Sequence, residues 1–266
     1  MSFVYAYKHN NKIFMIGDTK ITIDDSNGID NFKDKRQLVE ELGILKTIIL
    51  SNDLALGFAG NNVGLVDKAL RDIFQNSFEQ AEIIKILVEY SLKGIDAPDF
   101  ILTYKNEKIY LIKNGTIEER DNCYIGSRDI FEELQKRRNY EPIGSETRQI
   151  VRNLIKENVD NTVGGFCTEI SFATLNNAYI YSEVLDSTVT KERYIPSGGL
   201  IPLFDSAEDG GFTYQTLPFF NVDLTQYLEI QISQNNKTYL YAPIMVTPPH
   251  ECIYKYLFLP VEVKIE

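Results

Sequence analysis

The sequence is poor in residues from which many enzyme sites are built: it has no tryptophan, two histidines and three cysteines. Only His9 and His250 offer an imidazole base, so a histidine-based triad is poorly supplied, although the sequence leaves His250 open. No CxxC pair or histidine-rich cluster suggests zinc. Cys123, Cys167 and Cys252 lie far apart, and an odd count without a signal peptide is typical of free thiols in a reducing cytosol.

Basic stripes and long apolar runs are also missing. The net charge of -11 argues against a general nucleic-acid binder, which needs a basic surface. No apolar run approaches the roughly 20 residues that span a bilayer, and the N-terminus lacks the basic and apolar regions of a signal peptide. We therefore expect a cytoplasmic protein without nucleic-acid or membrane partners.

Phosphate-binding glycine motifs are absent as well. The chain contains neither a P-loop nor a GxGxxG run, and its glycine pairs at 164–165, 198–199 and 210–211 are more typical of turns. Asp24 and Asp25 could hold a cation, but an exposed loop is the default interpretation of such a pair. We expect no cofactor and no metal.

The hydrophobic pattern predicts an α+β fold, because strands and helices come in separate runs rather than in alternation. The expected strands are residues 2–8, 13–17, 46–50, 54–59, 99–104, 108–112, 116–119, 166–175 and 179–185. Two helices are expected between 63 and 90, and two more at 128–138 and 146–158, the last with Ser145 as N-cap. The remainder differs in composition: from Tyr194 onward it holds most of the nine prolines and only short apolar runs. We predict one domain over residues 1–190 and an all-β extension or small domain over 191–266.

Ser2 is the first candidate for chemistry. A small residue after Met1 usually permits removal of the initiator methionine, which would leave an N-terminal serine. Such a residue carries a hydroxyl and an α-amine with a pKa of roughly 7.7–8.0, and so can act as nucleophile and base in one.

Two spacings and two later motifs accompany Ser2. Asp18 lies sixteen positions after it in a Gly-Asp-Thr-Lys run, and Lys46 begins a strand fourteen positions before Gly60 of an Ala-Gly pair. Further on, Gly126 and Ser127 precede a helix, and Asp160 stands four positions before Gly164. Over residues 2–185 this order resembles the proteasome β-type and HslV-like branch of the N-terminal-nucleophile hydrolases. The resemblance implies a four-layer αββα sandwich that cleaves amide bonds.

The resemblance also implies a role for each residue. Ser2 would be the nucleophile and its own α-amine the base. Lys46 would favour the developing alkoxide, Asp18 would pair with Lys46, and the N–H of Gly60 would face the oxyanion. Ser127 and Asp160 would form hydrogen bonds around the amine and orient it.

Three features depart from the family pattern. The interval from Asp18 to Lys46 is longer than usual, and its polar stretch at 23–36 looks like an insertion that could restrict access or add a contact surface. Val163 stands where a serine is usual, which removes one hydrogen bond near the amine. The nucleophile is serine instead of threonine, without the methyl group that restricts its rotamer.

Two functions therefore compete. The first is a proteasome-like peptidase that acts on peptides or unfolded protein segments, and the second is a non-catalytic subunit used for assembly or binding. The resemblance further implies a homo-oligomer and, by analogy only, an unfolding ATPase partner. Removal or retention of Met1 separates the two functions.

Overall fold

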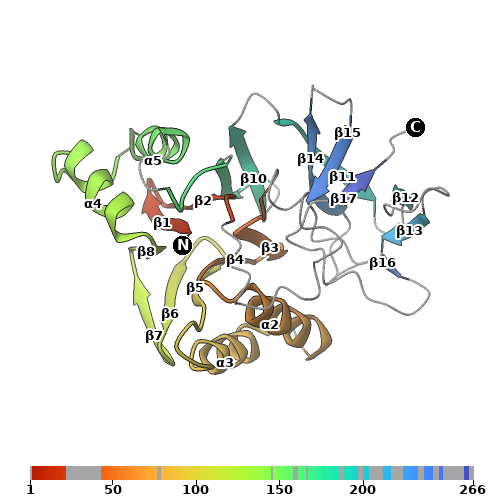
Figure 1. Cartoon of the computed structure of the whole chain (residues 1–266), viewed down its shortest axis with the longest axis horizontal. Coiled ribbons are helices and arrows are strands. Elements are labelled where there is room, and N and C mark those ends of the chain that lie inside the picture. Colours follow the sequence, from red (N-terminus) through yellow and green to blue (C-terminus); the bar gives the residue numbers. More distant parts are fainter. Residues whose placement is uncertain are drawn as a thin grey trace. The chain divides into compact units, whose positions relative to one another are not determined.

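The computed structural model describes residues 2–21, 43–76, 79–144, 146–157, 161–165, 167–175, 177–185, 189–196, 200–203, 212–216, 224–232, 237–241, 246–247 and 261–263. The chain divides into two compact units, Met1–Leu185 and Asp186–Glu266 (Figure 1). The predicted insertion at 23–36, Ser145 and Asp160 lie outside the described residues.

The first sheet of the first unit contains the N-terminal hairpin. Its strands are β1 (Phe3–His9), β2 (Lys12–Asp18), β8 (Asn122–Gly126), β9 (Cys167–Ala173) and β10 (Ala178–Leu185), in the order β10-β9-β2-β1-β8. All neighbouring strands are antiparallel. Asn10 and Asn11 both have positive φ, as a two-residue hairpin turn of type I′ requires, so the predicted hairpin is confirmed.

The second sheet is a meander. Its strands are β3 (Thr47–Ser51), β4 (Leu54–Ala59), β5 (Asp99–Tyr104), β6 (Lys108–Lys113) and β7 (Thr116–Arg120), paired in chain order. The sequence pattern missed the strand that follows them, β8, which leaves the meander and pairs with β1 in the first sheet. Residues 122–126 thus bring the end of the second sheet's meander next to the N-terminal strand.

Two helix pairs lie between the strand runs. Helices α2 (Val63–Asn76) and α3 (Gln80–Tyr90) follow β4, and α3 contacts β5 and β6 of the second sheet. Helices α4 (Arg128–Arg137) and α5 (Glu146–Glu157) follow β8, and α5 contacts β2 and β9 of the first sheet (Figure 1). The first unit is therefore a mixed α+β fold with two antiparallel sheets, as the segregated pattern predicted.

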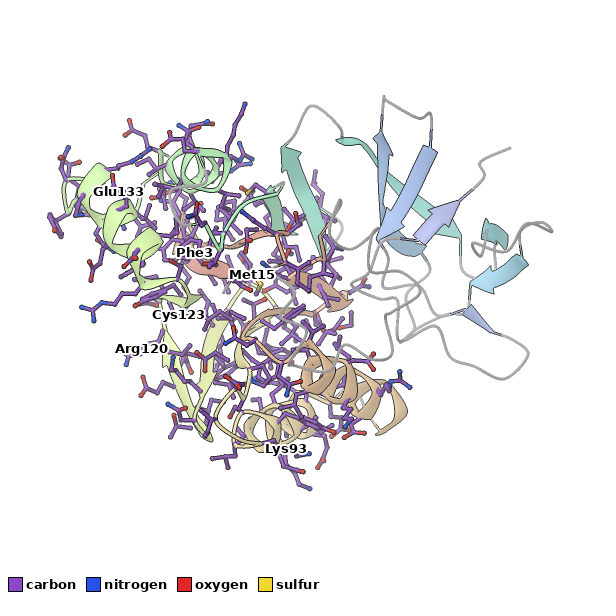
Figure 2. All side chains as sticks on the ribbon, in the orientation of Figure 1. Phe3, Met15, Lys93, Arg120, Cys123 and Glu133 are labelled. Carbon is purple, nitrogen blue, oxygen red and sulfur yellow. The ribbon has the colours of Figure 1, made fainter. Side chains whose placement is uncertain are left out.

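The alternation of side chains along β1 separates two environments. Phe3, Tyr5 and Tyr7 belong to a buried core shared with α4 and α5. Val4 faces the second sheet, because a Cβ built on Gly57 of β4 would lie 2.8 Å from Val4 Cγ1. Figure 2 labels Phe3 on the helix side and Met15, whose sulfur would lie 3.0 Å from the same Cβ, on the side of the second sheet. Ser2 continues the Val4 register and so belongs to the face between the sheets.

The second unit, where described, consists of strands. They are β11 (Val189–Pro196), β12 (Leu200–Leu203), β13 (Phe212–Thr216), β14 (Leu224–Ile232), β15 (Lys237–Tyr241), β16 (Val246–Thr247) and β17 (Val261–Val263). They form one sheet in the order β11-β14-β15-β17-β12-β13-β16. Within the described residues, no helix is long and apolar enough to cross a membrane.

Candidate active site

A buried ion pair joins the two sheets of the first unit. Asp18 ends β2 and Lys46 directly precedes β3, and the two side chains are almost completely shielded from solvent. Lys46 Nζ donates to Asp18 Oδ1 at 2.9 Å and to Oδ2 at 2.8 Å. The structure thus brings together two of the residues singled out from the sequence, although 28 positions separate them.

Two backbone amides also bind the Asp18 carboxylate. The N–H of Phe3 donates to Oδ1 at 2.8 Å, and the N–H of Gly164 donates to Oδ2 at 3.2 Å. Val4 pairs with Gly17 across the hairpin, so Phe3 lies opposite Asp18 at the strand end. Because Phe3 is the residue after Ser2, Asp18 fixes the backbone on which the candidate nucleophile sits.

Burial and mutual attraction act in opposite directions on this pair. Burial raises the pKa of the Asp18 carboxyl, while the Lys46 ammonium and the two amide donors oppose that rise. Burial likewise lowers the pKa of the Lys46 ammonium, and the Asp18 carboxylate opposes that fall. The pKa of Lys46 therefore depends on the acceptors that offset the cost of burying its charge.

The third N–H of the Lys46 ammonium also has an acceptor. Lys46 Nζ donates to the backbone carbonyl of Lys20, in the segment that follows Asp18. An ammonium has three donors, and the two Asp18 oxygens together with the Lys20 carbonyl accept from all of them.

Ser2 is held from the other side by β8 and α4. It is 6% exposed, and its carbonyl accepts the N–H of Ser127 at 2.7 Å. Gly126 has φ +91°, and any Cβ there would overlap the Ser2 carbonyl oxygen, so only glycine fits. The Gly126-Ser127 motif thus has a local reason: glycine admits the Ser2 backbone and the next residue binds it.

Ser127 also begins α4. Its side chain is buried, and its Oγ accepts the N–H of Ile130 at 3.3 Å as an N-cap. Ser127 therefore caps α4 with its side chain and binds the Ser2 carbonyl with its backbone N–H.

Gly60 lies at the far end of β4 from the β3–β4 turn. It has φ +148°, and a Cβ there would lie 3.0 Å from Pro98 Cα, so a side chain would crowd the backbone. The N–H of Phe58 donates to the Lys46 carbonyl at 3.0 Å, which brings this strand end alongside Lys46. Asn62 then caps α2 by accepting the N–H of Leu65 at 3.0 Å.

The side chain of Val163, which stands where the family pattern has a serine, is fully buried in the core shared with Phe3, Ile16 and α5. The neighbouring Gly164 N–H still reaches Asp18, so the backbone of this segment contributes to the site while the Val163 side chain fills the core. Asp160, predicted to orient the amine, lies outside the described residues, as does Met1.

Sequence reasoning missed the residues that surround Thr19. Thr19 is fully buried, and Gly43 and Gly165 both pack against it with positive φ. The sequence pattern places Gly164 in a motif with Asp160 and the pair at 164–165 in a turn, and it gives Gly43 and Gly165 no part in the site.

The histidines and possible metal ligands give no competing site in the described part of the chain. His9 lies at the end of β1, where its Nε2 is 3.0 Å from Asn10 Nδ2. His250 lies outside the described residues. No group of three or more His, Cys, Asp or Glu side chains suited to a metal occurs among the described residues.

Comparison with known proteins gives a structural likeness only. No protein-family model matches the chain, and no curated protein matches its sequence. Among solved structures, the chain is similar to eukaryotic HslV from Trypanosoma brucei, with a TM-score of 0.43 and 15% sequence identity over 64% of this chain and 98% of that chain.

Proposed function

We propose that the chain is a proteasome-like N-terminal-nucleophile hydrolase that cleaves peptide bonds with Ser2, once removal of Met1 has freed its amine. The observation that carries this proposal is the buried Asp18–Lys46 pair, bound to the backbone amide of the residue next to Ser2. Desolvation of a lysine this deeply buried is costly and is offset here by its ion pair and hydrogen bonds. Buried charged groups with perturbed pKa values are concentrated at functional sites, which supports a catalytic role.

The register of β1 supports a meeting between Ser2 and Lys46. A Cβ built on Gly17 would lie 3.4 Å from Val4 Cγ2 and 3.8 Å from Lys46 Cβ, so Val4 and Lys46 approach the same spot on β2. Ser2 shares the face of Val4. We therefore place the Ser2 hydroxyl beside the Lys46 ammonium.

The reaction follows from these positions. The α-amine accepts the hydroxyl proton as the Ser2 oxygen attacks the substrate carbonyl carbon. Lys46 stabilises the developing alkoxide, and the Gly60 N–H donates to the oxyanion of the tetrahedral intermediate. The protonated amine then gives its proton to the leaving nitrogen, and water hydrolyses the resulting ester. Ser127 and Asp160 are the proposed partners of the amine.

The wider proposal follows the same resemblance. It comprises a four-layer αββα sandwich in residues 1–190, a β-rich extension over 191–266, a cytoplasmic homo-oligomer and peptide or unfolded-protein substrates. An unfolding ATPase partner is proposed by analogy alone.

Intact mass of the untagged protein, with and without a peptide epoxyketone, tests the catalytic proposal. The expected result is loss of Met1 and one epoxyketone adduct, because that reagent needs both the hydroxyl and the free amine. Peptide hydrolysis and the adduct should both disappear in Ser2→Ala, while Ser51→Ala, at the β3–β4 turn, should retain both. Full hydrolysis in Ser2→Ala would overturn the assignment.

A non-catalytic, proteasome-like assembly or binding module is the second candidate. The observations that favour it are the nearly buried Ser2 and the Val163 side chain, which fills the core instead of supporting the amine. Retention of Met1 in native protein would support this candidate, and an epoxyketone adduct would exclude it.

A further inference from the structure

The segment Thr19–Lys20 directly follows Asp18, and its Lys20 carbonyl is the third acceptor of the Lys46 ammonium. Its backbone is bound from two directions. The Gly164 carbonyl accepts the N–H of Thr19 at 3.2 Å and that of Lys20 at 3.0 Å. On the other side, the N–H of Ile44 donates to the Thr19 carbonyl at 2.8 Å.

Two glycines pack so closely against Thr19–Lys20 that neither position has room for a side chain. Gly43 has φ +72°, and any Cβ there would overlap the Thr19 carbonyl oxygen. Gly165 has φ +74°, and a Cβ there would lie 2.5 Å from Thr19 Oγ1 and 3.0 Å from the Lys20 nitrogen. A side chain at either position would therefore push Thr19–Lys20 out of place.

We infer that Gly43 and Gly165 are positioning residues for Lys46, which they orient by holding Thr19–Lys20 so that the Lys20 carbonyl stays on the ammonium. At both positions the nearest atoms that an added Cβ would meet belong to Thr19 and Lys20, so each glycine acts through that segment. The inference rests on the proposed function only where it concerns hydrolysis, because the orientation of Lys46 is a property of the fold.

The chemical consequence has a definite sign. Among the residues that the structure describes, the charged groups that act on the Lys46 ammonium are the Asp18 carboxylate, which attracts it, and the Lys20 side chain, which repels it. The charged ammonium donates to the Lys20 carbonyl more strongly than the neutral amine would, so loss of this acceptor disfavours the charged form. The pKa of Lys46 should therefore fall below its value in the wild-type protein.

The test is an NMR titration of the full chain labelled with ¹³Cε-lysine, with the Lys46 signal assigned by its absence in Lys46→Arg. In Gly165→Ala and in Gly43→Ala the titration midpoint of Lys46 should fall by about one pH unit or more, as expected for loss of one charge-assisted hydrogen bond. Gly115→Ala is the matched control, because Gly115 also has φ +72° but lies in the β6–β7 turn against the exposed Leu92. It should leave the midpoint unchanged.

A second pair of variants distinguishes positioning from general damage. Thr19→Ala removes the oxygen that a Cβ at Gly165 would meet, so it should restore part of the midpoint in the Gly165→Ala background. It should restore nothing in the Gly43→Ala background, where the overlap is with the Thr19 backbone. If Gly43→Ala does not fold, Gly165→Ala with and without Thr19→Ala tests the inference alone. A Cβ at Gly165 first meets a side-chain atom, Thr19 Oγ1, which can shift more easily than backbone.

An unchanged Lys46 midpoint in folded Gly165→Ala would overturn the inference, as would an equal shift in Gly115→Ala. The NMR signal is read whether or not Met1 is removed. A wild-type protein that forms no epoxyketone adduct would therefore contradict the proposed function and leave the positioning result intact. If the adduct does form, its rate should drop at least tenfold in Gly165→Ala and recover partly with Thr19→Ala.

Discussion

At the scale of single residues, the Asp18–Lys46 pair shows how the chain keeps two charges in its interior. The carboxylate accepts from the ammonium and from two backbone N–H groups, and the ammonium has an acceptor for each of its donors. Buried charges are tolerated only with such complete partners. Removing one partner is therefore far more disruptive than removing both.

Lys46→Met should destabilise the protein by about 3–5 kcal/mol, because it leaves the Asp18 carboxylate buried without its cation. Adding Asp18→Asn should recover part of that loss, since a neutral amide still offers an oxygen to the Phe3 N–H. Denaturant unfolding of the two single variants and the double variant measures the coupling. If the free-energy costs of the two substitutions simply add in the double variant, the ion pair is contradicted. Epoxyketone labelling should be absent in the double variant even though part of its stability returns.

At the scale of secondary structure, the separation of the two sheets depends on small residues where strands face each other. Gly57 of β4 leaves room for Val4 of β1, and a Cβ on Gly17 of β2 would lie 2.8 Å from Thr47 Cγ2 of β3. A hydroxyl pair reinforces the contact, with Thr47 Oγ1 and Thr168 Oγ1 2.7 Å apart. The sheets thus meet closely beside the Asp18–Lys46 pair.

Gly57→Ala should cost about 1–3 kcal/mol, because the new methyl group enters a space already filled by Val4 Cγ1. Val4→Ala alone should also destabilise the fold by leaving a cavity. The double variant should be more stable than the sum of the two costs predicts, since each change makes room for the other. Thermal and urea unfolding check this, and additivity would mean that the two positions do not share that space.

At the scale of the whole first unit, both of its cysteines are shielded from solvent, and Cys167 belongs to the core under α4 and α5. Cys123, labelled in Figure 2, and Cys167 are both buried. Burial raises the pKa of the Cys123 thiol to about 12. Charged side chains such as Lys93, Arg120 and Glu133 lie at the periphery of this unit in the same view.

Iodoacetamide should therefore leave Cys123 and Cys167 unmodified in native protein at pH 8, where almost no Cys123 thiolate exists. Both should react when the unit unfolds, and in urea their modification should follow the same transition as loss of circular dichroism. Peptide mass spectrometry locates the label on each cysteine. Rapid labelling of Cys123 in native protein would contradict the burial of β8 against β1.

The sequence by itself determined the local elements and the candidate pair. Alternation in residues 2–17 and helical spacing in 128–157 depend on near neighbours, so the hairpin, β1, β2, α4 and α5 could be predicted to within a few residues. The intervals from Ser2 to Asp18 and from Lys46 to Gly60 pointed to a shared site, and the catalytic roles of these residues remain predictions.

Only the tertiary structure decided the contacts between elements distant in the chain. In the structure, β8 is an additional strand that pairs with β1, and Val163 is buried in the core. The segment Thr19–Lys20 packs between Gly43 and Gly165. These contacts join residues that lie far apart in the sequence, such as Thr19 and Gly165. The local periodicity of the sequence gives no information about them. The sequence thus predicted Asp18 and Lys46 as a pair, while only the fold showed the backbone groups that form hydrogen bonds to the two charges.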